Sequence, residues 1–211
     1  TNERDPFTAT LDGNGHIIQN LYINGSPYFD DYVGLFGYIS GKDIAVRNLA
    51  LSGSLMKITG DRYVGAIAGY AKDLSLRNII STGSVIGHTN VGSITGSLSS
   101  GELSNSFASG SVIGENTVGG FIGESLDSSL INNLTTSYVS GTYDIGSLIG
   151  ISINTLILET HWATNITNEN VNINATEGYF GDTLSKLQCP INSASTRCSE
   201  IATLYKGWKN N

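Results

Sequence analysis

Apolar and polar residues alternate along most of the chain, in runs of four to seven residues separated by glycine and serine. Alternation with a period of two predicts short β-strands, because successive side chains of a strand point to opposite faces. Three apolar columns recur, so each repeating unit is expected to contain three short strands. They lie two residues before an asparagine (Ile18, Val46, Leu76, Leu103, Leu130, Ile157), seven residues after it (Leu55, Val85, Val112, Val139), and within a glycine-framed block (Leu35, Ile67, Ile94, Phe121, Leu148).

The glycine-framed blocks, such as VGGFIG at 118–123, give the length of the repeat. Their last glycines fall at positions 37, 69, 96, 123 and 150, so the spacings are 32, 27, 27 and 27 residues. The asparagine column is spaced by 28, 30, 27 and 27 residues and consists of Asn20, Asn48, Asn78, Asn105 and Asn132. Two independent columns with one period indicate a solenoid. Its coils stack about 4.8 Å apart and bury an apolar face that one coil alone leaves exposed.

The sequence therefore predicts an all-β fold, a right-handed parallel β-solenoid (β-helix) of about five to six coils with a repeat of about 27 residues. Residues 1–25 are expected to form an N-terminal capping coil, 26–164 the repeats, and 165–211 an irregular C-terminal cap with short helices. In this cap, CPINSASTRC predicts a disulfide between Cys189 and Cys198, with two free thiols as the alternative. A disulfide would imply an oxidising compartment.

The five asparagines of the column are expected to form a structural ladder. They lie two residues from inward-facing aliphatic residues, so they either point inward or occupy a corner of the coil. Stacked amides can hydrogen-bond from coil to coil, which removes a cost of about 1–3 kcal/mol for each buried amide left unpaired. A polar binding stripe is the alternative interpretation of the same column.

Composition and charge exclude several classes of partner. The formal net charge is −7 and the pI about 4.8, so the surface repels phosphate backbones and a nucleic acid partner is not expected. No apolar stretch approaches the roughly 18 residues that span a bilayer, so the chain is not expected to cross a membrane. Twenty-six glycines against three prolines indicate many tight turns between short strands.

Candidate catalytic and metal-binding motifs are weak. His16, His88 and His161 fall at different places in the repeat, and neither HExxH nor GxSxG occurs, so no catalytic or metal-ligating residue is predicted. The segment DGNG at 12–15 resembles the start of a calcium loop, but the distal glutamate is missing. A type I′ turn joining two strands explains it better, and Ca²⁺ is the only cofactor worth considering.

Two further columns carry polar side chains. Asp43, Asp73 and Asp127 could supply paired carboxylates for a carbohydrate-active β-helix enzyme, but a row of turn residues explains them better. Ser52, Thr82, Ser109 and Thr136 form a hydroxyl column. It lacks the regular T-x-T rows that would be expected of an ice-binding surface.

Aromatic residues gather in the first two repeats. The loop SPYFDD, at 26–31, is inserted before the first full repeat, and inserted loops on a rigid scaffold often carry recognition. Aromatic rings there could stack on sugar rings. The candidate binding residues are Tyr28, Phe29, Asp30, Asp31, Tyr32 and Tyr63.

VGGFIG, together with the segments LSNSFASGSV and LINNLTTSYV, resembles the GLUG family of bacterial repeats over roughly residues 6–208. Ser137 departs from the pattern, because the other units carry a glycine there (Gly53, Gly83, Gly110). The resemblance implies a module of a large secreted or surface-attached bacterial protein, either adhesin-like or accessory to an immunoglobulin-cleaving protease.

We therefore expect a non-catalytic extracellular repeat module that serves as a stalk, spacer or adhesion surface, with a host or cell-surface glycan or protein as its partner. Two alternatives remain open at this point. One is a carbohydrate-active β-helix enzyme that uses Asp43 and Asp73; the other is an accessory domain of a secreted protease or toxin.

Overall fold

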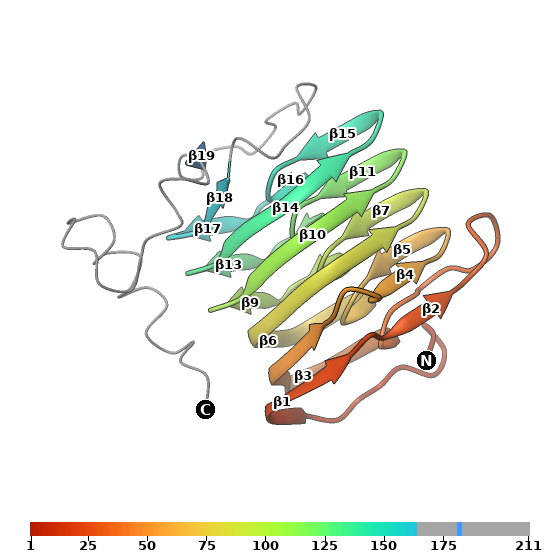
Figure 1. Ribbon diagram of the computed structural model, residues 1–211. Helices are drawn as coiled ribbons and strands as arrows, with labels where there is room; N and C mark the ends of the chain where they lie inside the picture. Colours follow the sequence, from red (N-terminus) through yellow and green to blue (C-terminus); the bar gives the residue numbers. More distant parts are fainter. Residues whose placement is uncertain (164–180, 183–211) are drawn as a thin grey trace.

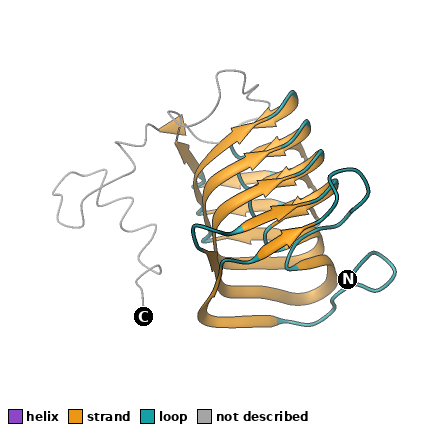
Figure 2. Cartoon of the chain, turned by 45° about the vertical axis from the view of Figure 1, so that its right-hand side comes forward, coloured by secondary structure: helices purple, strands orange, loops and turns teal. Residues whose placement is uncertain are grey.

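The computed structural model describes residues 1–163 and 181–182. Within them the chain is all-β and forms a parallel β-solenoid, whose coils are stacked along one axis (Figure 1). The predicted fold class is confirmed. Figure 2 shows the same stack from the side, with strands on all faces and short loops at the corners.

The first two layers of the stack differ from the rest. They contain β1 (Leu11–Gln19) and β2 (Tyr22–Asn24), then β3 (Phe36–Ser52) and β4 (Lys57–Thr59). Four turns with a spacing of 27 residues follow, slightly fewer than the five to six expected. Their strands are β5 (Arg62–Gly65) and β6 (Ala68–Ile86); β7 (Thr89–Gly92), β8 (Thr95–Ser99), β9 (Glu102–Ser104) and β10 (Phe107–Ile113); β11 (Asn116–Gly119), β12 (Ile122–Leu126), β13 (Ser129–Ile131) and β14 (Leu134–Ser140); β15 (Tyr143–Gly146), β16 (Ile149–Ile153), β17 (Leu156–Leu158) and β18 (His161–Ala163).

Every pairing between these strands is parallel, and β19 (Gly181–Asp182) pairs with β18. The register repeats the sequence period: Phe107 of β10 pairs with Ile80 of β6 on one side and with Leu134 of β14 on the other. The strands form a 15-stranded sheet and a 4-stranded sheet of β5, β7, β11 and β15. Because each residue lies beside its equivalent in the next turn, side chains of one kind form continuous columns.

The coil turns at three corners, and each corner is a column of residues with left-handed backbone. The first corner contains Asn48, Asn78, Asn105, Asn132 and Glu159; the second Asp43, Asp73, Ser100, Asp127 and Asn154; the third Tyr32, Tyr63, Asn90, Thr117 and Asp144, all with φ between 45° and 62°. Asparagine and aspartate tolerate this conformation better than other non-glycine residues. The polar columns of the sequence are therefore largely backbone requirements.

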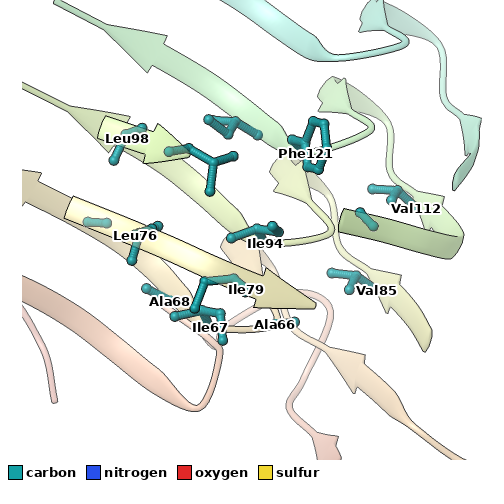
Figure 3. Close-up of a cluster of buried hydrophobic side chains, with 14 of the residues drawn as sticks. Ala66, Ile67, Ala68, Leu76, Ile79, Val85, Ile94, Leu98, Val112 and Phe121 are labelled. Carbon is teal, nitrogen blue, oxygen red and sulfur yellow. The ribbon is translucent and has the colours of Figure 1, made fainter. Parts of the chain in front are cut away.

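The core lies between the three sides and is filled by the inward side chains of successive turns (Figure 3). In the predicted columns, Val46, Leu76 and Leu103 are fully buried, and so are Ile67, Ile94 and Phe121 of the glycine-framed blocks; Val85, Val112 and Val139 are buried as well. Burying one such side chain contributes about 1.5–3 kcal/mol. The stack therefore depends on this continuous apolar column.

Two assignments near the N-terminus were wrong. Leu55 is 71% exposed, and Ile58 takes its place in the column opposite Val85. Ile18 pairs with Leu51, whereas Leu11 pairs with Val46. Leu55 is displaced by an insertion between Asn48 and Ile58, where ten positions separate residues that are seven apart in the next turn (Asn78 to Val85). Ile18 is displaced by the register shift between Asp12 and His16 in β1.

The DGNG segment at 12–15 does not form the type I′ hairpin turn that the sequence predicts. The DGNG segment lies inside β1, which pairs in parallel with β3 and shifts its register between Asp12 and His16. Asn14 and Gly15 do have positive φ, of 49° and 75°. The left-handed residues thus form a bulge at a corner of the coil. An antiparallel hairpin has no place in a parallel stack.

The C-terminal expectations lie outside the described residues. These are the short helices of 165–211 and the disulfide between Cys189 and Cys198. Among the described residues no helix is long and apolar enough to cross a membrane.

Candidate ligand-contact surface

The loop at 26–31 leaves β2 and leads to the third corner. Its backbone is ordered by its own side chains: the amide of Ser26 donates to Asp30 Oδ2 at 2.6 Å, and the amide of Tyr28 donates to Ser26 Oγ at 3.3 Å. The carbonyl of Asp30 accepts from the amide of Asp61 in the next turn at 2.8 Å. Asp30 therefore holds the loop together.

Tyr28 and Phe29 stand at the tip of this loop and are 75% and 85% exposed. Their ring centroids are 6.5 Å apart, and the ring planes meet at 64°. Exposed aromatic side chains that touch one another on an ordered loop form an amphipathic contact surface. We call Tyr28 and Phe29 the aromatic tip.

Asp31 ties the loop to the next turn. Its carboxylate accepts hydrogen bonds from Arg62 Nε, at 3.1 Å, and from Arg62 Nη2, so the guanidinium binds the carboxylate in a bidentate manner. This contact raises the pKa of Arg62 above its ordinary value. Exposed ion pairs contribute little to stability, so the pair orients the loop more than it stabilises the fold.

Tyr32 and Tyr63 stack on each other at the third corner, with centroids 5.0 Å apart and planes only 4° apart. Tyr38 and Tyr70 stack beside them at 4.8 Å and 9°. Edge contacts of 5.5 Å join Tyr32 to Tyr38 and Tyr63 to Tyr70. These four residues form a cluster, called here the tyrosine quartet, that spans two turns.

Sequence reasoning missed Tyr38. The signal was present, because Tyr38 and Tyr70 each follow the last glycine of a glycine-framed block, and the two residues pair in register. Burial, reinforced by Tyr70 and Glu3, raises the pKa of Tyr38 to about 12. Burial also raises the pKa of Tyr32 and of Tyr63. Tyr32, Tyr38 and Tyr63 therefore stay neutral over the ordinary pH range, and the quartet packs as an aromatic cluster beside the loop.

The quartet ends at the following turn, where small polar residues take over. Asn90 replaces Tyr63 at the corner, and Ser97 pairs with Tyr70. Both side chains are nearly buried, and both donate to Glu124 Oε2, at 3.2 and 3.3 Å. Glu124 thus accepts hydrogen bonds from both polar residues that follow the tyrosine quartet in the next turn.

The asparagine column lies on the first corner. Asn78 Nδ2 donates to Asn48 Oδ1 at 2.8 Å, and Asn132 Nδ2 donates to Asn105 Oδ1 at 2.6 Å. The four side chains range from half-buried to exposed. Asn20 lies outside this column, because it continues β1 opposite Gly53 and accepts from the amide of Leu55.

Asp12 caps the ladder instead of Asn20. Its Oδ1 accepts from Asn48 Nδ2 at 2.9 Å, and its Oδ2 accepts from Arg47 Nε at 2.9 Å. The hydrogen bond from Asn48, followed by that from the Asn14 amide, lowers the pKa of Asp12 below its ordinary value.

The aspartate column lies at the second corner of the coil. Asp43 and Asp73 hold the left-handed second corner, and Asn154 donates to Asp127 Oδ1 at 3.0 Å in the same column. No group of histidine, cysteine or acidic residues within the described ranges has a metal-binding arrangement. The sequence did not predict that His88 lies between two carboxylates. His88 Nδ1 lies 3.4 Å from Asp61 Oδ1, one turn earlier, and His88 Nε2 lies 2.8 Å from Glu115 Oε2, one turn later.

Comparisons with known proteins establish the fold and little else. A solved structure from Bacteroides ovatus, of a protein provisionally named an immunoglobulin A1 protease, matches with a TM-score of 0.67 and 18% identity, covering 98% of this chain and 74% of that one. Among curated proteins, halomucin from Haloquadratum walsbyi is 39% identical over 88 residues, which is 42% of this chain and 1% of halomucin. No family model matches, so the GLUG resemblance is one of motif alone.

Proposed function

We propose that this chain is a non-catalytic β-solenoid module of an extracellular protein, secreted or attached to a cell surface, and that it contacts a glycan through the aromatic tip. The observation that carries the proposal is the exposure of Tyr28 and Phe29, 75% and 85%, on a loop that is ordered by Asp30 and Asp31. The solenoid itself acts as the stalk or spacer that presents this loop.

The chemistry of the loop suits a sugar. Aromatic faces stack on the C–H faces of sugar rings, and flanking carboxylates accept hydrogen bonds from sugar hydroxyls. Because the loop is held by its own hydrogen bonds and by the Asp31–Arg62 pair, little conformational entropy is lost on binding. The tyrosine quartet extends the aromatic surface at the base of the loop.

The comparisons support the extracellular part of the proposal. Halomucin shares a stretch of 88 residues with this chain, which is the length of about three repeats, and it is about a hundred times longer than the matched region, as expected of a repeat module within a very large protein. The Bacteroides ovatus structure shows that the same fold occurs in a protein provisionally named an immunoglobulin A1 protease. An accessory role beside such a catalytic domain is compatible with the module.

The test is binding to an array of glycans and matrix proteins. The double variant Tyr28→Ala/Phe29→Ala is expected to bind its glycan at least about ten-fold more weakly than wild type, a loss of about 1.4 kcal/mol. Tyr143→Ala is the matched control, because it removes an aromatic ring that is 60% exposed on another turn. Unchanged binding by the double variant would refute the aromatic tip as the contact surface, and binding to matrix proteins alone would replace the glycan with a protein partner.

The carbohydrate-active enzyme has less support. Asp43 and Asp73 occupy left-handed corner positions, where Ser100 and Asn154 stand in other turns, so a backbone requirement explains the column without catalysis. Incubation of candidate glycans with wild type and with Asp73→Asn distinguishes the two functions. Turnover by wild type that is lost in the variant would establish the enzyme.

A further inference from the structure

The aromatic tip is followed directly by a carboxylate with a free oxygen. The loop after β2 projects beyond the side of the stack (Figure 1), and Asp30 comes next in the chain after Phe29. Asp30 is exposed, and its Oδ2 accepts a hydrogen bond from the amide of Ser26 at 2.6 Å. Its Oδ1 forms no hydrogen bond within the described part of the chain. This ionised oxygen is available to a ligand that stacks on the two rings.

The arginine at the base of the loop does not compensate the charge of Asp30. Arg62 binds both oxygens of Asp31, so these two charges cancel. The other cations of the first two layers lie beside carboxylates of their own or before the loop: Arg4 between Glu3 and Asp5, Lys42 next to Asp43, Arg47 paired with Asp12, and Lys57 opposite Tyr22 in β2. The aromatic tip therefore has an uncompensated negative charge at its side.

The tyrosine quartet at the base of the loop lies in a negative potential. Burial is the largest cause of the raised pKa of Tyr32, and the charges of Glu3 and Asp31 raise it further, whereas Arg62 acts in the opposite direction. For the raised pKa of Tyr63, burial is followed by the charge of Glu124. A potential that opposes ionisation of a phenol attracts a cation and repels an anion at the same place.

Exposed aromatic rings beside a free carboxylate suit a cationic ligand. The face of a tyrosine or phenylalanine ring attracts an ammonium group, and a carboxylate oxygen accepts a charge-assisted hydrogen bond from it. An anionic sugar, such as a uronic acid or a sulfated sugar, would bring further negative charge to a chain whose net charge is −7. The charge of the site therefore selects among the glycans that the rings alone would accept.

We infer that the ligand of the aromatic tip is an amino-sugar glycan with free, protonated amino groups. This inference rests on the glycan contact proposed above and adds the chemical class of the sugar. A sugar ring stacks on Tyr28 or Phe29, and an ammonium group donates a hydrogen bond to Asp30 Oδ1. The carboxylates around the tyrosine quartet, Glu3 and Asp31 among them, favour further ammonium groups along the same glycan.

Calorimetric titration of the full chain with glucosamine oligomers and with N-acetylglucosamine oligomers of equal length tests the inference, since the two share one backbone and the acetyl group removes the charge. At about pH 5.5 the carboxylates are ionised and the sugar amine is protonated. Wild type is expected to bind the glucosamine oligomer at least about ten-fold more tightly, with a preference that shrinks as salt is added. Asp30→Asn keeps an oxygen that can accept from the Ser26 amide and should reduce the preference at least about three-fold. Asp144→Asn, which removes an exposed carboxylate beside Tyr143, is the matched control and should behave like wild type.

Equal or tighter binding of the N-acetylated oligomer, or an Asp30→Asn variant with the full preference of wild type, would overturn the amino-sugar inference and leave the glycan contact standing. If wild type binds no sugar of either kind or of the glycan array, the proposed function itself fails. An oligolysine peptide that binds as tightly as the glucosamine oligomer would replace the sugar with a basic protein segment. The melting temperature shows whether Asp30→Asn is folded, and Glu3→Gln makes the same test if it is not.

Discussion

Asn132 and Asn133 are neighbours in the chain, yet their amides serve different parts of the solenoid. Asn132 has φ of 60° at the first corner and donates to Asn105 Oδ1. Asn133 is fully buried: its Oδ1 accepts from the amide of Ser106 at 2.9 Å, and its Nδ2 donates to the carbonyl of Leu103 at 3.0 Å. The buried amide of this turn is therefore Asn133.

Replacing Asn133 by alanine should lower the free energy of unfolding by about 1–3 kcal/mol, because Ser106 N–H and the Leu103 carbonyl lose their partner in the core. Asn132→Gly is the control and should cost clearly less, since glycine adopts the left-handed corner freely. Urea unfolding curves of the two variants measure the difference. Equal losses would contradict the distinction between the corner and the core.

Stability in acid should depend on Asp12. Its folded-state pKa is lowered, mainly by the hydrogen bond from Asn48, so its contribution is present above the unfolded pKa of about 3.9 and disappears as the pH falls through the lower folded value. The melting temperature of Asp12→Asn should therefore fall less than that of wild type between about pH 5 and about pH 2. Parallel curves for the two proteins would exclude this role.

The tyrosine quartet should be visible in an alkaline titration. Burial raises the pKa of Tyr38 to about 12, so its stabilising contribution is complete below about pH 10 and is lost as the pH rises towards the folded value. In the ultraviolet absorbance of phenolate, Tyr38→Phe should remove a late-ionising step. Tyr143→Phe controls for the loss of one chromophore, and a late step that persists in Tyr38→Phe would assign it to another residue.

The third corner offers a stabilising substitution. Thr117 is β-branched and has φ of 54°, a conformation that costs about 1–3 kcal/mol for such residues. Asn90 occupies the same position one turn earlier, so Thr117→Asn should raise the melting temperature by about 2–4 °C. Thr136→Asn, a substitution within strand β14, should not raise the melting temperature. A lower melting temperature for Thr117→Asn would show that packing of the Thr117 methyl group outweighs the strain.

The aromatic surface was partly visible in the sequence. Tyr32 and Tyr63 were assigned to one site because aromatic residues gather in the first two repeats, and they stack face to face. Tyr38 was missed, although it stacks on Tyr70. A column assignment that included the residue after each glycine-framed block would have found it.

The sequence by itself determined that the chain is a stack of turns, because a period of 27 residues places each apolar side chain above its equivalent, as with Leu76, Leu103 and Leu130. Only the tertiary structure decided which residues fill each column where the period breaks. Asp12 caps the asparagine ladder in place of Asn20, and Ile58 enters the core in place of Leu55. The physical reason is that an insertion or a bulge shifts the register, and a shift by one residue exchanges the inward and outward faces of a strand.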